Sequence, residues 1–197
     1  GTLTTTNTAS QAQSGIQMSD TNGDNIGDVV AFLTKENQNG GFTLNGDGDA
    51  KDIDRAVAAA KAAFPAWSQT PTAERSRILL AIADGIEREI DELARIESID
   101  NGKPVALARS SDMPRAVANF RFFATAILHT RDEAHFTDQR AINYTLRQPR
   151  GVAGLISPWN LPLYLLSWKI GPALATGNTV VAKPSEVTPA TAHLLAK

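Results

Sequence analysis

The stretch from Gly151 to Pro189 constrains the fold of this chain more than any other. It contains two short apolar runs, separated by a polar turn and a long apolar helical segment, and a second polar turn follows the second run. The order strand, turn, helix, strand, turn predicts one right-handed βαβ unit. The turns at 157–160 and 183–186 then lie at the carboxyl ends of two parallel strands, where open α/β sheets bind ligands. We therefore expect the functional site at these two turns.

The patterns before this unit predict an α/β domain in which helices cover the sheet. Apolar residues recur at helical spacing over 49–68, 70–99 and 105–129. Thr70 is the expected cap of the second helix, and Pro114 is expected to kink or restart the third. Polar and apolar residues alternate over 139–148, which predicts a half-buried strand. The predicted buried face of the first helix is Ile53, Val57, Ala60, Phe64 and Trp67.

Length, composition and charge are those of an ordinary soluble globular protein. With 197 residues, the chain is long enough for one or two domains with a sizeable core. A net charge of −2 gives no indication of nucleic acid or an anionic membrane as a partner. No run approaches the ~18 apolar residues of a membrane helix, and no basic segment precedes an apolar one as in a secretory signal. We therefore expect a cytoplasmic protein that binds neither nucleic acid nor membrane.

Residues 1–48 differ in composition from the rest of the chain. Thr, Asn, Ser and Gln dominate their first half, and such a polar head cannot bury enough apolar surface to order itself alone. One weak metal candidate lies in this head. Oxygen side chains at alternate positions suit a hard cation such as Ca²⁺, but Asn25 and Ala31 stand where an EF-hand loop has Gly and Glu. The alternative is an Asn/Asp/Gly turn. The candidate ligands are Asp20, Asn22, Asp24 and Asp28.

Asn160 is the most informative polar residue of the first turn. Pro158 and Pro162 fix the backbone on either side of it. A rigidly held primary amide can donate a hydrogen bond to a developing oxyanion. The alternative is an asparagine that caps the helix beginning at about Leu161, and spacing alone favours that alternative.

Several short motifs along the chain are distinctive in residue identity. They are RAVAAAK at 55–61, FPAW at 64–67, Glu74-Arg75, DNGKP at 100–104, NFRFF at 119–123, PWNLP at 158–162 and GNTVVAKPSEVTP at 177–189. With these motifs the chain resembles the aldehyde dehydrogenase superfamily over about residues 47–197. The sequence from Asn143 to Ala173 is most similar to the branch that acts on 2-hydroxymuconic and 2-aminomuconic semialdehydes.

The resemblance implies that residues 49–197 are the amino-terminal part of a Rossmann-like cofactor domain, that is, a partial NAD-binding domain with helices packed on an incomplete parallel sheet. Only two parallel strands of that sheet are expected here, and the head at 1–48 does not match the family's usual beginning. The implied substrate is a small-molecule aldehyde. The implied assembly is a homo-oligomer.

The resemblance also assigns roles at the first turn. Asn160 would supply the side-chain half of the oxyanion hole for the thiohemiacetal and thioester intermediates. The neighbouring backbone would line the groove for the nicotinamide cofactor. The residues of this groove are Ile156, Ser157, Pro158, Trp159 and Asn160.

At the second turn the resemblance implies cofactor binding by Lys183, Ser185 and Glu186, with Lys183 and Glu186 hydrogen-bonding the adenosine ribose. A carboxylate accepts a hydrogen bond from a 2′-hydroxyl and repels a 2′-phosphate, so Glu186 favours NAD over NADP. Taken without the resemblance, Lys183 and Glu186 are more simply a surface ion pair.

The chain departs from the family in one decisive respect, because it contains no cysteine. The family's chemistry needs a cysteine thiolate that attacks the aldehyde and a glutamate that activates water, and both are expected downstream of Lys197. Two functions therefore remain open. The chain is either the amino-terminal portion of an NAD-dependent aldehyde dehydrogenase, or a catalytically inactive nucleotide-binding or protein-interaction module.

Overall fold

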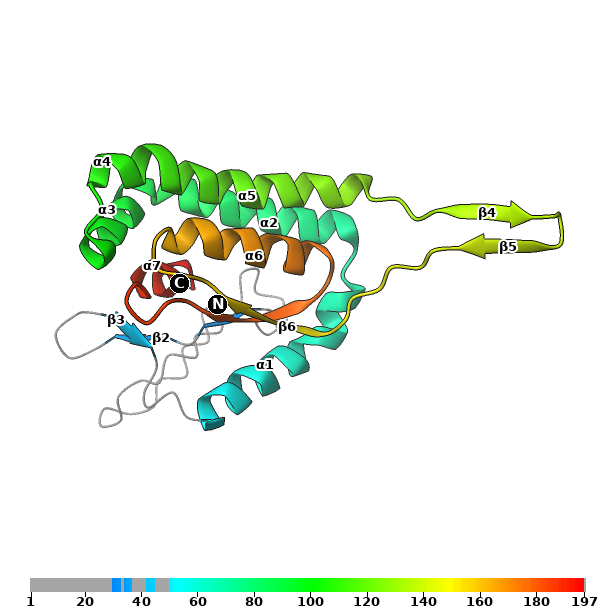
Figure 1. Ribbon diagram of the computed structural model, residues 1–197, viewed down its shortest axis with the longest axis horizontal. Helices are drawn as coiled ribbons and strands as arrows, with labels where there is room; N and C mark the ends of the chain where they lie inside the picture. Colours follow the sequence, from blue (N-terminus) through cyan, green and yellow to red (C-terminus); the bar gives the residue numbers. More distant parts are fainter. Residues whose placement is uncertain (1–29, 33, 37–41, 45–49, 197) are drawn as a thin grey trace.

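A computed structural model describes residues 30–32, 34–36, 42–44 and 50–196, with side chains from Ile53 to Ala196. Figure 1 shows how the elements are arranged. In chain order they are β1 (Val30–Phe32), β2 (Thr34–Glu36), β3 (Phe42–Leu44), α1 (Ala50–Gln69), α2 (Thr72–Arg88), α3 (Ile90–Asn101), α4 (Val105–Leu107), the π-helical turn η1 (Ala108–Asp112), α5 (Met113–Ala126), the 3₁₀ turn η2 (Ile127–His129), β4 (Ala134–Thr137), β5 (Ala141–Tyr144), β6 (Val152–Ile156), α6 (Pro162–Ala175), β7 (Thr179–Lys183) and α7 (Ala190–Leu195).

The predicted βαβ unit is confirmed: β6 and β7 are parallel neighbours, and α6 connects them. Their sheet has a third strand, because β1 pairs in parallel with β7 on its other side, giving the order β1-β7-β6. The expectation of only two parallel strands is therefore wrong. The third strand comes from within the polar head, where an apolar run at 29–33 provides a segment suited to the sheet.

Strand β7 is buried on both faces, which places it at the centre of a layered structure. Val180 and Ala182 belong to the main core, whereas Val181 packs with Ala56 and Ala60 of α1. Successive side chains of a strand point to opposite faces, so α1 covers one face of the sheet and α6 the other. The Thr179 hydroxyl donates a hydrogen bond of 2.9 Å to the carbonyl of Ala60 and ties β7 to α1.

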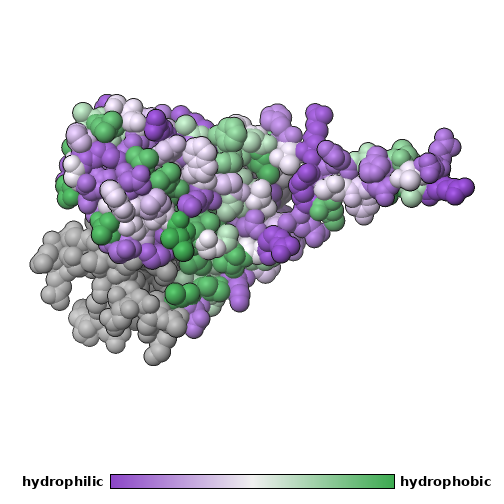
Figure 2. Space-filling view, in the orientation of Figure 1, coloured by the Kyte–Doolittle hydropathy of each residue, from purple (hydrophilic) through white to green (hydrophobic). Residues whose placement is uncertain are grey.

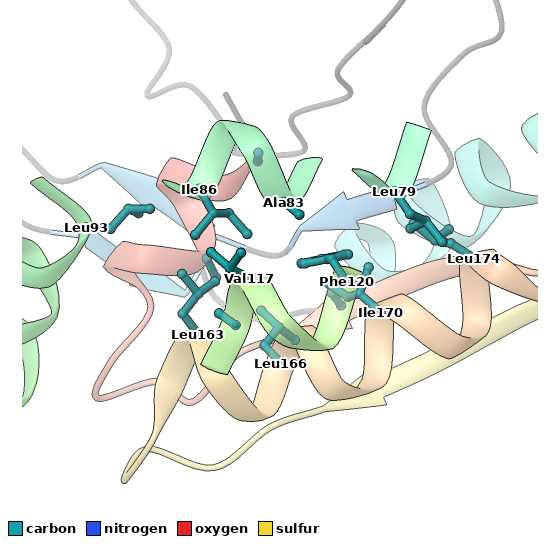
Figure 3. Packing of buried hydrophobic residues seen from close by; sticks show 14 of the residues in the cluster. Leu79, Ala83, Ile86, Leu93, Val117, Phe120, Leu163, Leu166, Ile170 and Leu174 are labelled. Atoms are coloured by element: carbon teal, nitrogen blue, oxygen red, sulfur yellow. The ribbon is translucent and has the colours of Figure 1, made fainter. Parts of the chain in front are cut away.

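The main core lies between α6 and the pair α2 and α5. Figure 3 shows their side chains pointing toward one another. Phe120 of α5, Leu79 of α2 and Leu174 of α6 are fully buried. Such side chains each contribute roughly 1.5–3 kcal/mol by burial. The predicted buried face of α1 is confirmed at Ala60 and Trp67. It is shifted elsewhere, because Ala56 and Ala63 are buried while Ile53 is exposed.

The segment from 70 to 101 forms two helices where periodicity predicts one. Glu89 leaves helical geometry (φ −99°, ψ 18°), which ends α2 and begins α3. The bend redirects α3 so that its buried face packs against η1 and α7. The prediction that Thr70 caps the helix is also wrong, since its hydroxyl donates back to the carbonyl of Ala66. Gly102 closes α3 in the left-handed conformation that favours glycine (φ 75°).

The third helical segment has the predicted extent and an interruption near the predicted place. The chain passes from α4 through the π-helical turn η1 into α5, and Pro114 lies in the first turn of α5. A proline is tolerated there because the first helical amides need no acceptor within the helix. The turn η1 brings Asp112 into the protein interior, where it is 2% exposed.

Within the alternating segment at 139–148, only residues 141–144 form the predicted strand, and this strand is not half-buried. β5 pairs with β4 in an antiparallel hairpin, and every residue of both strands is exposed. Figure 2 shows this hairpin projecting from the body, with hydrophobic and hydrophilic residues both on its surface. The alternation predicts one apolar face that packs on a core, but among the described residues no element covers that face.

Candidate active site

Two turns meet at the carboxyl ends of β6 and β7. Ile156 and Lys183 are paired in the sheet, and the N–H of Ser157 donates to the carbonyl of Lys183 at 3.1 Å. The hydroxyl of Thr188 reaches the carbonyl of Trp159 at 3.5 Å. The turns that the sequence singles out are therefore joined into one surface at the position where parallel sheets bind ligands.

Asn160 is exposed in the first turn, and it does not cap α6. The cap position is Leu161, which makes no side-chain capping bond, and the N–H of Leu163 instead donates to Glu97 Oε2 at 3.4 Å. Among the described residues, no hydrogen bond engages the side-chain amide of Asn160, whereas its main-chain carbonyl accepts one from Lys103. Asn160 therefore does not act as a helix cap, and its side-chain amide is available to donate a hydrogen bond to a ligand.

The rest of the first turn is largely apolar and open. Ile156 is 68% exposed and Trp159 is 60% exposed, so both present apolar surface beside Asn160. Pro158 is exposed as well, whereas Ser157 is buried. The Ser157 hydroxyl has no hydrogen-bond partner in the described part of the chain. Small-molecule sites are typically lined by apolar and aromatic side chains with a few polar groups among them, and this turn presents both kinds.

The second turn carries an ion pair at its surface. Lys183 Nζ lies 3.0 Å from Glu186 Oε2, and the two side chains are 37% and 68% exposed. A backbone hydrogen bond and the Lys183 ammonium hold the pKa of the Glu186 carboxyl below its usual value, so the carboxylate is ionised at neutral pH. Ser185 is buried, and its hydroxyl oxygen accepts the N–H of Val187 at 3.4 Å.

Sequence reasoning missed a buried charged cluster next to Asn160, formed by Glu97, Lys103 and Asp112. Lys103 Nζ lies 3.3 Å from Glu97 Oε1, forms an ion pair with Asp112, and donates to the carbonyl of Asn160 at 3.3 Å. Burial raises the pKa of Glu97 to about 7 against the opposing effect of Lys103. One sequence signal was present, since Glu97 follows Leu93 and Ala94 on the buried face of α3.

The described residues give no indication of a metal. None of their His, Asp and Glu side chains gather in a group of three that could hold an ion. The calcium candidate formed by Asp20, Asn22, Asp24 and Asp28 lies outside the described residues. Likewise, no helix in the described ranges combines the length and apolar character needed to cross a membrane.

Taken together, the two turns can bind a polar ligand with hydroxyl groups. A neutral amide donor, an ionised carboxylate acceptor and an ammonium donor lie at the ends of adjacent strands, beside exposed apolar surface. A carboxylate accepts hydrogen bonds from hydroxyls, and a fixed amide donates to a carbonyl or an oxyanion.

Comparison with known proteins agrees with this geometry. Residues 42–197 match the model of the aldehyde dehydrogenase family. The chain is 55% identical over 150 residues to 2-aminomuconic semialdehyde dehydrogenase of Danio rerio, covering 76% of this chain and 31% of that protein. It is 50% identical over 149 residues to 2-hydroxymuconic semialdehyde dehydrogenase of Pseudomonas sp. (strain CF600), covering 73% and 31%.

Solved structures show the same similarity in three dimensions. PnpE from Pseudomonas sp. WBC-3, in a structure with nicotinamide adenine dinucleotide, matches with a TM-score of 0.72 and 48% identity over 75% of this chain and 30% of its own. The chain thus spans about a third of the length of the relatives it matches. Since the family match covers most of its residues, the chain belongs to the aldehyde dehydrogenase family.

Proposed function

We propose that this chain is the amino-terminal portion of an NAD-dependent aldehyde dehydrogenase that oxidises a semialdehyde to a carboxylic acid. The observation that carries the proposal is the junction of the two turns, with an unengaged amide on one and an ionised carboxylate on the other. The similar relatives whose names refer to muconic semialdehydes support the substrate class.

The residues of the second turn suit the adenosine ribose of NAD. Glu186 remains ionised and 68% exposed, so it can accept hydrogen bonds from ribose hydroxyls, and Lys183 can donate to them. A 2′-phosphate would be repelled by the same carboxylate, which favours NAD over NADP. Ser185 would support the cofactor site from within the turn, where it is buried and its hydroxyl oxygen accepts the N–H of Val187. When bound, NAD supplies the hydride acceptor.

The residues of the first turn suit the reacting aldehyde and the adjoining part of the cofactor. Asn160 would donate from its side-chain amide to the oxygen of the aldehyde as negative charge develops on it. The exposed apolar surface of Ile156 and Trp159 would exclude water from one side of the groove, together with the backbone of Ser157 and Pro158. The nucleophile must come from elsewhere, since these 197 residues contain no cysteine.

That absence favours a second candidate function for the 197 residues by themselves. Without a thiol they would bind a nucleotide, or a protein partner, without oxidising an aldehyde. We expect little NAD-linked aldehyde oxidation by this chain alone. Oxidation that is insensitive to thiol reagents would require a different mechanism.

The remaining features of the proposal concern location, assembly and domain organisation. We propose a cytoplasmic homo-oligomer that binds no nucleic acid. Exposed apolar side chains on the hairpin, Phe136, Ile142 and Tyr144, support self-association. We also propose that 1–48 and 49–197 are distinct segments, with β1 of the first adding a strand to the sheet of the second.

Titration of the chain with NAD and with NADP, followed by calorimetry, tests the proposed site. We expect NAD to bind more tightly than NADP, and Glu186→Gln to weaken NAD binding by about tenfold, because a hydrogen bond to a charged acceptor is lost. Glu74→Gln is the matched control, since Glu74 forms an exposed (i, i+3) pair with Arg77 on α2. Equal binding of both nucleotides, or an unaffected Glu186→Gln variant, would refute the assignment.

A further inference from the structure

The buried cluster of Glu97, Lys103 and Asp112 lies directly behind the first turn and has no part in the proposed chemistry. The side chains of Lys103, Glu97 and Asp112 are 11%, 0% and 3% exposed. These are three charged groups on three different parts of the fold: Glu97 on α3, Lys103 on the turn after it, and Asp112 in η1. Both carboxylates bond to the same ammonium, which therefore joins the three parts.

Lys103 is held at both its main chain and its ammonium group. Its N–H donates to Asn101 Oδ1 at 2.9 Å, and its carbonyl accepts the Ser98 hydroxyl at 2.5 Å. Its ammonium lies between Glu97 and Asp112. Because both the main chain and the ammonium are held, Lys103 loses the freedom that makes most lysines poor anchors.

The cluster bonds to the chain at two points, Asn160 itself and the start of α6 just after it. Lys103 Nζ donates to the carbonyl of Asn160 at 3.3 Å, and Glu97 Oε2 accepts the N–H of Leu163 at 3.4 Å. The bond from Leu163 satisfies a main-chain amide at the start of α6 that would otherwise lack a partner. The end of α3 also bonds to the helix that follows the second turn, since Asp100 Oδ2 accepts the N–H of Ala190 in α7 at 2.9 Å.

A buried ion cluster contributes little net stability compared with apolar groups of the same volume, because removing the charges from water offsets their attraction. Its directional hydrogen bonds, however, fix geometry in a way that apolar packing does not. An oxyanion donor stabilises a transition state only if it is oriented before the reaction, so fixed geometry at Asn160 has a direct chemical consequence.

We propose that Lys103, locked between Glu97 and Asp112, is a positioning residue that fixes the main chain at Asn160 and thereby the direction of its side-chain amide. This inference rests on the proposed role of Asn160 as an oxyanion donor. Lys103 itself touches neither substrate nor cofactor in this assignment, and it acts through the carbonyl of Asn160.

Nuclear magnetic resonance of the isotopically labelled chain, without nucleotide, tests the proposal through the order parameter of the Asn160 backbone N–H. We expect a rigid value of about 0.85 in the wild type and a fall below about 0.6 in Lys103→Met. The matched control is Arg109→Met, because the exposed Arg109–Asp91 pair joins the same two elements, η1 and α3, away from the turn. An order parameter that stays at the wild-type value in a folded Lys103→Met chain would overturn the proposal.

A pH titration of the wild-type chain keeps the proposal testable even if Lys103→Met does not fold. The ¹⁵N shift of Leu163 reports on its bond to Glu97, and the ¹³C′ shift of Asn160 reports on its bond to Lys103. As Glu97 ionises, it draws the ammonium toward itself, so both shifts should move with one midpoint near the Glu97 pKa of about 7. Both movements should vanish in Glu97→Gln. If the ¹⁵N shift of Leu163 moves while the ¹³C′ shift of Asn160 stays constant, Lys103 does not couple Glu97 to the turn, and the proposal is refuted.

The nucleotide titration on the same variants distinguishes this inference from the proposed function. If the chain binds no NAD but Asn160 still loses order in Lys103→Met, the proposed function fails and the positioning role stands. If NAD binds with the expected preference and Asn160 stays ordered in Lys103→Met, the positioning role fails and the proposed function stands.

Discussion

Two turns follow adjacent parallel strands. Lys103 bonds to the first of them and Lys183 lies in the second, yet the surroundings of the two lysines are opposite. Lys103 is 11% exposed between two buried carboxylates, whereas Lys183 is 37% exposed beside the exposed Glu186. A buried pair is costly to break because its partner is left without compensation, while an exposed pair is readily replaced by water or a ligand. The comparison suggests that the first turn is built to stay fixed and the second to exchange partners.

The largest expected effect on stability comes from removing Lys103, the buried lysine of the two. Lys103→Met leaves Glu97 and Asp112 buried without a cation, and we expect it to lower the free energy of unfolding by about 3–5 kcal/mol in urea at neutral pH. If the unpaired charge is the cause, Lys103→Met/Glu97→Gln should recover part of the loss. A decrease no larger than that of the exposed-site variant Lys183→Met would remove the contrast between the two lysines.

A smaller effect is expected from the titration of Glu97. Its pKa rises from 4.5 to about 7 in the folded chain, so the folded state holds the proton more tightly than the unfolded state over this range. The free energy of unfolding should therefore fall as pH rises from about 4.5 to 7, by up to about 3 kcal/mol.

Glu97→Gln tests this dependence, because the variant cannot lose a proton there. Burial also raises the pKa of Asp100, which adds a decline of the same sign, so the measurement is the difference between wild type and variant. Urea unfolding at pH 5 and pH 8 should show a smaller decline in Glu97→Gln. Equal declines in the two proteins would mean that Glu97 is not the group responsible.

The sequence predicts the fold best where local pattern and tertiary packing agree. Two apolar runs around an apolar helix are sufficient for β6, α6 and β7, because a βαβ unit is largely determined by its own segment. The break at Glu89 and the exposure of β5 were not predictable in this way. Both depend on what the segment packs against, and period alone does not specify a partner.

The candidate site likewise has features that local motifs predict and features that depend on contacts between distant residues. Asn160 and Glu186 are proposed as site residues from motifs, because each lies in a short recognisable turn. The hydrogen bond from Lys103 to Asn160 joins positions 57 apart, and that from Leu163 to Glu97 joins positions 66 apart. Neither spacing carries a local signal, and the DNGKP motif identified Lys103 as a family residue without indicating what it touches.

The smallest expected effect on stability comes from the exposed side of the comparison. Lys183→Met opens the ion pair with Glu186, and we expect unfolding in urea to be unchanged within the error of the measurement, since water solvates the released carboxylate. The pair is also expected to weaken with salt, unlike the buried cluster. Nucleotide affinity, by contrast, should fall, because Lys183 is proposed to donate to the ribose. A variant that loses stability but not affinity would show that the second turn is structural, and the proposed division between a fixed turn and an exchanging turn would then fail.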